Sequence, residues 1–134
     1  MEPKKKTVLL VDDDKFLLNM YALKFTNSGF VAEVAESGGA ALQKLRDGLV
    51  PDLILSDLVM PTMDGLEFIR RVKEEGLAKG VPIAVLSNQG QTTEIERAKE
   101  LGVAGYIVKA STIPSEVVEE MKKILSKFAP PTRV

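Results

Sequence analysis

Five short apolar runs recur along the 134 residues, and each is followed by a segment with helical character. The runs occupy residues 8–11, 31–35, 53–56, 83–86 and 105–108. Three of them are almost unbroken in apolar character, which is typical of strands that helices cover on both faces. Strands that alternate with helices predict a parallel sheet with right-handed crossovers. The sequence therefore predicts one α/β domain, a doubly wound (βα)5 fold with helices on both faces.

The segments between these runs carry recognisable helix starts and ends. We expect helices at about 15–27, 39–47, from 64, 93–101 and from 114. Expected caps and end residues are Asp14, Ser37, Asp64 with Glu67 as a capping box, Gly102 after the fourth helix, and Pro114 at the first position of the fifth. The first helix carries Leu17, Met20, Tyr21 and Phe25 at helical spacing. Glu33 interrupts the second run, which indicates an edge strand.

Composition excludes several kinds of chemistry. The chain has no cysteine and no histidine, so thiolate nucleophiles, imidazole bases and His or Cys metal ligands are all absent. The formal net charge of −1 indicates no general affinity for nucleic acid or anionic membranes. No apolar run approaches the roughly 18 residues of a membrane span. We expect a cytoplasmic protein with a flank at 1–6, one domain at 7–128 and a frayed tail at 129–134.

Polar residues follow four of the predicted strands. Acids follow the first (Asp12, Asp13, Asp14) and end the third (Asp57), Ser87 and Asn88 follow the fourth, and Lys109 follows the fifth. The carboxyl ends of parallel strands lie at one edge of the sheet, which is where ligands bind in such folds. We therefore expect acids, a hydroxyl and a lysine to lie together there.

Carboxylates gathered in this way repel one another, so at least one should have a raised pKa. Oxygen ligands suit a divalent cation such as Mg²⁺. A cation, a lysine and a hydroxyl around one carboxylate can neutralise the oxygens of a phosphoryl group. Asp57, at the end of the middle strand, is then the natural nucleophile, and the product is an acyl phosphate.

Five motifs in order resemble the receiver domain of two-component response regulators. They are Val11-Asp12-Asp13, Ser56-Asp57-Leu58-Val59-Met60-Pro61, Met63-Asp64-Gly65, Leu86-Ser87 and Gly105-Tyr106-Ile107-Val108-Lys109. The similarity covers residues 7–128 and is greatest to single-domain regulators of the chemotaxis type. It implies a flavodoxin-like strand order of 2-1-3-4-5.

The resemblance implies a phosphorelay role for the acidic residues. Asp57 would accept a phosphoryl group from a sensor histidine kinase or a histidine phosphotransfer protein. Asp13 and Asp57 would bind Mg²⁺ directly, with Mn²⁺ as a substitute. Asp12 would bind it directly or through water, and the backbone carbonyl of Val59 would be a further ligand. The protein would promote only its own phosphorylation and dephosphorylation.

The resemblance also implies a conformational switch. Lys109 and Ser87 would contact the phosphoryl group, and Tyr106 would swing inward behind Ser87. Judged by spacing alone, Tyr106 is a packed surface residue. A downstream protein would bind the face formed by the fourth helix, fifth strand and fifth helix, without direct nucleic-acid binding or membrane insertion. The chain would be a monomer or a homodimer that forms on phosphorylation.

The sequence departs from the family pattern in three places, the third of which is a pair of residues. Ala110 stands where the family has proline after a cis bond, so the Lys109–Ala110 bond is either a costly cis bond or trans. Asn88 is bulkier than usual and restricts access to the phosphate. Val59 and Gln89 flank the route of an attacking water, and the apolar Val59 cannot orient it. We therefore expect a long-lived phosphorylated state.

Two other functions compete with this interpretation. A phosphohydrolase of the haloacid dehalogenase type would use Asp12 and Asp14, but Lys15 stands where Thr or Val is expected and no acidic pair follows a later strand. A receiver-like binding module that acts without phosphorylation is consistent with Ala110 and Asn88.

Overall fold

A computed structural model describes residues 5–88 and 92–128 of the chain. The Gln89 position therefore lies outside the described residues. The described elements run in the order β1 (Thr7–Val11), α1 (Lys15–Asn27), β2 (Val31–Ala35), α2 (Gly38–Arg46), β3 (Leu53–Asp57), α3 (Gly65–Glu74), β4 (Ile83–Ser87), α4 (Thr92–Glu100), β5 (Gly105–Val108), the 3₁₀ turn η1 (Lys109–Ser111) and α5 (Pro114–Phe128). The five predicted strand–helix units are confirmed.

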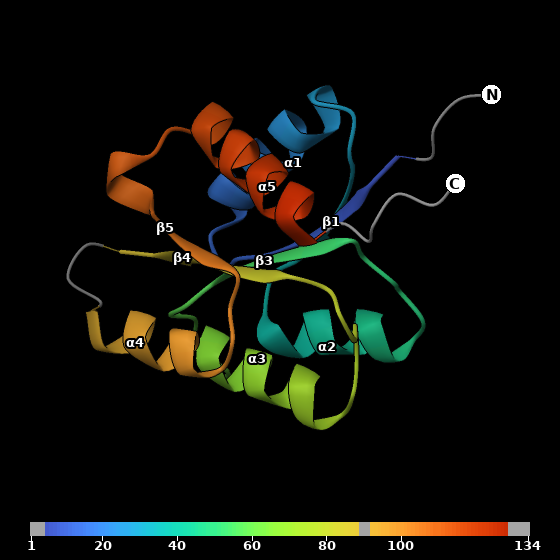
Figure 1. Ribbon diagram of the computed structural model, residues 1–134, viewed down its shortest axis with the longest axis vertical. Helices are drawn as coiled ribbons and strands as arrows, with labels where there is room; N and C mark the ends of the chain where they lie inside the picture. Colours follow the sequence, from blue (N-terminus) through green and yellow to red (C-terminus); the bar gives the residue numbers. More distant parts are fainter. Residues whose placement is uncertain (1–4, 89–91, 129–134) are drawn as a thin grey trace.

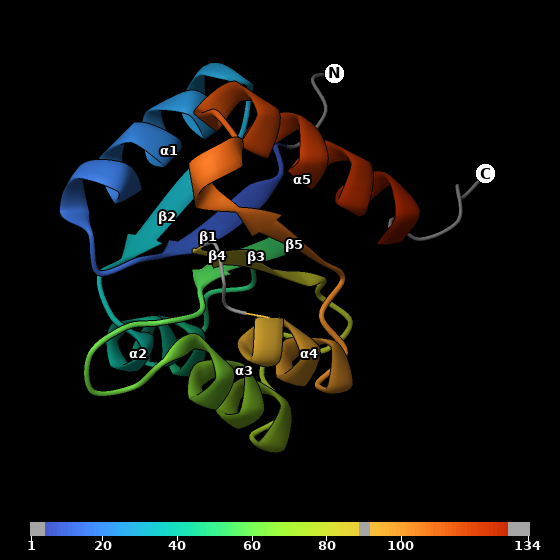
Figure 2. The same ribbon diagram turned by 90° about the vertical axis from the view of Figure 1, so that its left-hand side faces the viewer.

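The five strands form one parallel sheet in the order β2-β1-β3-β4-β5. Helices α1 and α5 lie on one face, and α2, α3 and α4 lie on the other (Figures 1 and 2). Both the doubly wound fold and the predicted strand order are confirmed. The position of β2 at one edge agrees with the polar Glu33 inside that strand.

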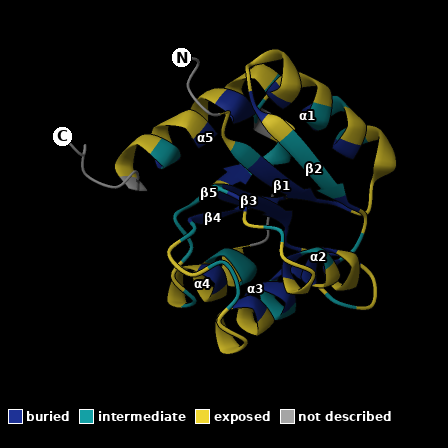
Figure 3. Cartoon of the chain, turned by 90° about the vertical axis from the view of Figure 1, so that its right-hand side faces the viewer, coloured by how far each residue is buried: buried dark blue, intermediate teal, exposed yellow. Residues whose placement is uncertain are grey.

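Successive residues of the central strands point to opposite faces, so the sheet separates two hydrophobic cores. Val8 and Leu10 of β1 pack toward α1 and α5, whereas Leu9 and Val11 pack toward the helices of the other face. Figure 3 shows β1, β3 and β4 buried and β2 largely half-buried. The double covering explains why the central strands read as continuous apolar runs.

The helix caps follow the sequence with one exception. Asp14, Ser37 and Asp64 each accept a hydrogen bond from a backbone N–H in the first turn of the helix that follows. The capping box is half formed, because the Glu67 carboxylate pairs with Arg70 and Arg71 instead of returning to the backbone of Asp64. Those two arginines lie one turn along the helix and compete successfully for the carboxylate.

The buried side of α1 differs from the predicted one. Leu18, Tyr21 and Phe25 are buried, whereas Leu17 and Met20 are half-buried. α1 is apolar around most of its circumference, so spacing alone could not select the stripe that faces the sheet.

Helix α4 is weakly anchored. Of its residues only Ala98 is buried, and Ile95 is partly buried against the same core. The helix ends before Gly102, whose φ of 86° is the left-handed conformation expected of a glycine past a helix end. In the described part of the chain, no helix has the length and apolar character needed to cross a membrane.

Candidate functional site

Three carboxylates gather at the carboxyl edge of the sheet. Asp12 follows β1, and Asp57 ends the neighbouring β3, whose register pairs Ser56 with Val11. Ligand oxygens of Asp12, Asp13 and Asp57 all lie within 4.8 Å of one another. Asp12 and Asp57 are buried, whereas Asp13 is exposed. The parallel topology thus brings together residues 45 positions apart, as the sequence predicted.

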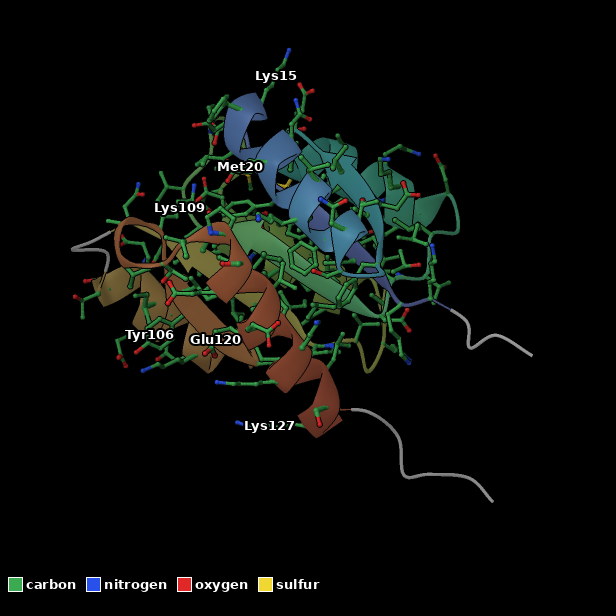
Figure 4. All side chains as sticks on the ribbon, turned by 90° about the horizontal axis from the view of Figure 1, so that it is seen from above. Lys15, Met20, Tyr106, Lys109, Glu120 and Lys127 are labelled. Atoms are coloured by element: carbon green, nitrogen blue, oxygen red, sulfur yellow. The ribbon has the colours of Figure 1, made fainter. Side chains whose placement is uncertain are left out.

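Lys109 adds a positive charge to the cluster from another strand end. It follows β5, and its Nζ atom lies 3.1 Å from Asp57 Oδ2 and 3.1 Å from Asp12 Oδ2. Figure 4 shows Lys109 in the upper left of the view, below Lys15 and Met20 of α1. One ammonium therefore neutralises part of the charge of two buried carboxylates.

The electrostatics of the site centre on Asp57. The pKa of the Asp57 carboxyl is raised to about 6, because burial, the largest cause, and the neighbouring Asp12 charge outweigh the lowering effects of Lys109 and the Val59 backbone N–H. The sequence predicted a raised pKa from repulsion alone, whereas burial is the larger cause. Burial lowers the pKa of Lys109, but the two carboxylates outweigh it and the net direction is upward.

The donor set fits a hard divalent cation. Asp12 Oδ1 accepts a hydrogen bond from the Asp14 backbone N–H at 2.9 Å. Asp12 Oδ2 is buried and has no aligned hydrogen bond, although Lys109 Nζ approaches it. A buried carboxylate oxygen without an aligned donor, beside two further carboxylates, is the environment that a cation such as Mg²⁺ stabilises.

Gly65 allows α3 to begin directly against the end of β3. Its N–H donates to the Leu58 carbonyl at 2.7 Å. A Cβ atom at this position would lie 2.1 Å from the Asp57 carbonyl oxygen. The sequence motif included Gly65, but this close approach was missed, because only the packing of α3 on β3 reveals it.

The loop between β3 and α3 contains a strained residue. Thr62 has a φ of 69°, and the Met63 N–H donates to the Pro61 carbonyl at 2.7 Å across it. A β-branched residue is disfavoured in this left-handed region. Val59, in the same loop, is 48% exposed.

We expect Thr62→Asn to raise the free energy of unfolding by about 1 kcal/mol, because asparagine tolerates the left-handed region far better than threonine. Urea denaturation measures the change. The same substitution at Thr26, an exposed position inside α1, should alter stability by less than about 0.5 kcal/mol because the two residues have similar helix propensities. An equal gain at both positions would contradict the strain.

The remaining candidate residues lie on β4 and β5. Ser87 is buried, and its hydroxyl donates to the Ile107 carbonyl at 3.4 Å. The Tyr106 side chain lies outward, 48% exposed, under Lys99 of α4. Asn88 is exposed. The described backbone has no cis peptide bond, so the Lys109–Ala110 bond is trans.

The model of the response regulator receiver domain family matches residues 8–122. The chain belongs to this family. Receiver domains are signalling modules of two-component systems, and the acidic cluster at the carboxyl edge of the sheet is compatible with Mg²⁺ binding. The family match favours this assignment over the phosphohydrolase alternative.

Several receiver domains and response regulators are similar to the chain. The phosphate regulon transcriptional regulatory protein PhoB of Pseudomonas aeruginosa is 33% identical over 93% of this chain and 54% of its own length. The DNA-binding response regulator MtrA of Mycolicibacterium smegmatis is 32% identical over 95% of this chain and 54% of its own. The chain thus spans about half the length of the curated relatives it matches.

Solved structures agree with the fold of the receiver domain. The chemotaxis protein CheY4 of Vibrio cholerae superposes with a TM-score of 0.83 at 28% identity, over 90% of this chain and 99% of that one. A response regulator of Chloroflexus aurantiacus superposes with a TM-score of 0.83 at 34% identity, over 92% and 99%.

Proposed function

We propose that this receiver domain accepts a phosphoryl group on Asp57 from a phosphohistidine of a sensor histidine kinase or histidine phosphotransfer protein. The observation that carries the proposal is the placement of Lys109 Nζ 3.1 Å from a carboxylate oxygen of both Asp57 and Asp12. These 134 residues contain no histidine, so the donor imidazole does not come from among them. We assign the receiver domain to residues 7–128, with flanks at 1–6 and 129–134.

In the proposed transfer, an oxygen of Asp57 attacks the phosphorus of the donor. The new O–P bond gives an acyl phosphate, and the P–N bond breaks with its electron pair passing to the donor imidazole, which takes up a proton. Asp57 must be ionised to attack, and a pKa of about 6 leaves it largely ionised above pH 7. Lys109 lies where its charge can neutralise the transferred oxygens.

A divalent cation completes this charge arrangement. Asp12, Asp13, Asp57 and the Val59 backbone carbonyl are the proposed ligands of Mg²⁺ or Mn²⁺. The bound cation supplies further positive charge for the phosphoryl oxygens. A cation held by these residues would also offset the charge of Asp12 Oδ2, which is buried without an aligned donor.

Intact mass measurement after incubation with acetyl phosphate and Mg²⁺ tests the acceptor. The parent protein should gain the mass of one phosphoryl group, and Asp57→Asn should gain none. Asp47→Asn, which changes an exposed carboxylate at the end of α2, should react like the parent. No gain in the parent, although the protein remains folded, would instead favour the phosphorylation-independent binding module.

The phosphorylated state should be long-lived. Val59 is the proposed residue beside the path of an attacking water, together with Gln89, and an apolar side chain cannot orient that water. Val59→Asn should accelerate loss of the phosphoryl group by up to about tenfold, because one hydrogen bond is worth roughly 0.5–1.5 kcal/mol. Radiolabel or mass decay in Mg²⁺ buffer measures the rate.

Val50, 78% exposed in the loop before β3, provides the matched control. Val50→Asn should leave the lifetime unchanged. Loss of phosphate from the parent within seconds, or equal acceleration by both substitutions, would overturn the proposed role of Val59.

The proposed response to phosphorylation involves Ser87 and Tyr106. Ser87 would exchange its 3.4 Å hydrogen bond to the Ile107 carbonyl for the phosphoryl group. Tyr106 would then swing inward and change the surface formed by α4, β5 and α5, where a downstream protein binds. PhoB and MtrA are by name a transcriptional and a DNA-binding regulator. For this chain we propose a protein partner at this surface, with the chain as a monomer or as a homodimer formed on phosphorylation.

A further inference from the structure

A lysine of one element covers the aromatic ring of another beside the candidate site. Lys99 Nζ of α4 lies 5.1 Å from the ring centroid of Tyr106 in β5. This distance is within the cation–π range of about 6 Å. The contact joins a helix to the edge strand of the sheet, so breaking it changes how the two elements are held together.

Because α4 is weakly anchored, its contact with Tyr106 is important for holding the helix in place. Ala98 is the one buried residue of the helix, and it lies next to Lys99 in the sequence. A helix with so little buried apolar area is easily displaced, so each remaining contact accounts for a large share of its attachment. The position of α4 and the conformation of Tyr106 are therefore linked through Lys99.

Charged residues near Lys99 and Tyr106 do not outcompete the contact between them. Lys99 also pairs with Glu96 at 3.6 Å, but both side chains are more than half exposed, and such pairs contribute little. Tyr106 also lines a groove with Thr112, Glu116 and Glu120, and none of these three groove residues is a cation. Figure 4 shows Tyr106 on the outer side with Glu120, apart from Lys109.

We propose that Lys99 is a positioning residue that holds Tyr106 outward, so that the inward swing of Tyr106 requires the release of its contact with α4. The proposal rests on the switch described above. The free energy of the cation–π contact then opposes the phosphorylated conformation. By linkage, removing the contact raises the affinity for a phosphoryl analogue by the factor by which it raises the inward population.

The chain contains two tyrosines, Tyr21 and Tyr106, so incorporation of 3-fluorotyrosine yields two ¹⁹F resonances. Tyr21→Phe assigns them. Spectra are recorded without ligand and during titration with beryllofluoride and Mg²⁺, whose saturated spectrum defines the inward conformation. The variants are Lys99→Met, which keeps a good helix former, Lys99→Arg, which keeps the cation, and Glu96→Gln, which breaks the ion pair alone.

Lys99→Met should move the Tyr106 resonance toward the inward position in the unliganded protein. The inward population and the apparent beryllofluoride affinity should both rise about two- to fivefold, the range expected for an exposed cation–π contact. Lys99→Arg and Glu96→Gln should match the parent. An unchanged resonance in Lys99→Met, or equal shifts in Lys99→Met and Glu96→Gln, would overturn the proposal.

The two arms of the experiment separate this inference from the proposed function. If Lys99→Met, but neither Lys99→Arg nor Glu96→Gln, shifts the Tyr106 resonance from its parent position without ligand while beryllofluoride alters no variant, the contact with Lys99 holds the Tyr106 ring and only phosphoryl acceptance fails. If beryllofluoride titrates every variant with one midpoint, acceptance stands and the positioning role is overturned.

Discussion

Replacing Asp57 with asparagine is expected to stabilise the metal-free protein at neutral pH by about 1–3 kcal/mol. Ionising the buried Asp57 carboxyl costs free energy, and the difference between 3.8 and about 6 in its pKa corresponds to roughly 3 kcal/mol. Asparagine carries no such charge, and Lys109 retains Asp12 as its partner. Urea denaturation in the presence of a chelator measures the change.

The pH dependence of the Asp57→Asn effect distinguishes this cause from a packing change. Because the pKa of Asp57 is raised in the folded state, the folded parent is more stable against unfolding at low pH. It loses that extra stability as the pH rises through about 6. The advantage of Asp57→Asn should therefore be full at pH 7.5 and fall to roughly a third at pH 4.5. A stability gain in Asp57→Asn that is independent of pH would contradict ionisation of Asp57 as its cause.

Two further measurements complete this experiment. Asp13→Asn changes an exposed member of the same cluster and should stabilise by less than about 1 kcal/mol. Added Mg²⁺ should stabilise the parent more than it stabilises Asp57→Asn, because a ligand that binds the folded state stabilises it more when it binds more tightly.

Replacing Gly65 with alanine is expected to destabilise the domain by about 3 kcal/mol or more, at the upper end of overpacking effects. The new Cβ would lie 2.1 Å from the Asp57 carbonyl oxygen and 2.8 Å from the Leu58 Cα atom, both of which are backbone. Backbone at the end of a central strand cannot rotate away as a side chain can, so α3 must move. Chemical denaturation measures the loss.

Gly39 provides the matched control, because it also lies in the first turn of a helix but a Cβ there meets nothing within 4 Å. Gly39→Ala should stabilise by about 0.5–1 kcal/mol through the gain in helix propensity. Similar losses at both positions would show that the close approach of Gly65 to β3 is not the cause. A Gly65→Ala protein that remains folded should also accept phosphate more slowly, because the displaced backbone carries Asp57.

The sequence was sufficient to predict the architecture and the membership of the acidic site. Apolar runs alternating with helical segments determine a parallel sheet, and the ends of parallel strands necessarily meet at one edge. Asp12, Asp57 and Lys109 could therefore be assigned to one cluster before any distance was known. The edge position of β2 followed in the same way from Glu33.

Other features depend on how segments distant in sequence pack together. One example is which side of the apolar α1 faces the sheet, and another is the burial that raises the Asp57 pKa. Two more are the contact of Gly65 with the end of β3 and the placement of Lys99 on the Tyr106 ring. Side-chain periodicity and strand order are local or topological properties, which a sequence pattern encodes directly. Exposure and interatomic distance are properties of the assembled core, and only the tertiary structure determined them.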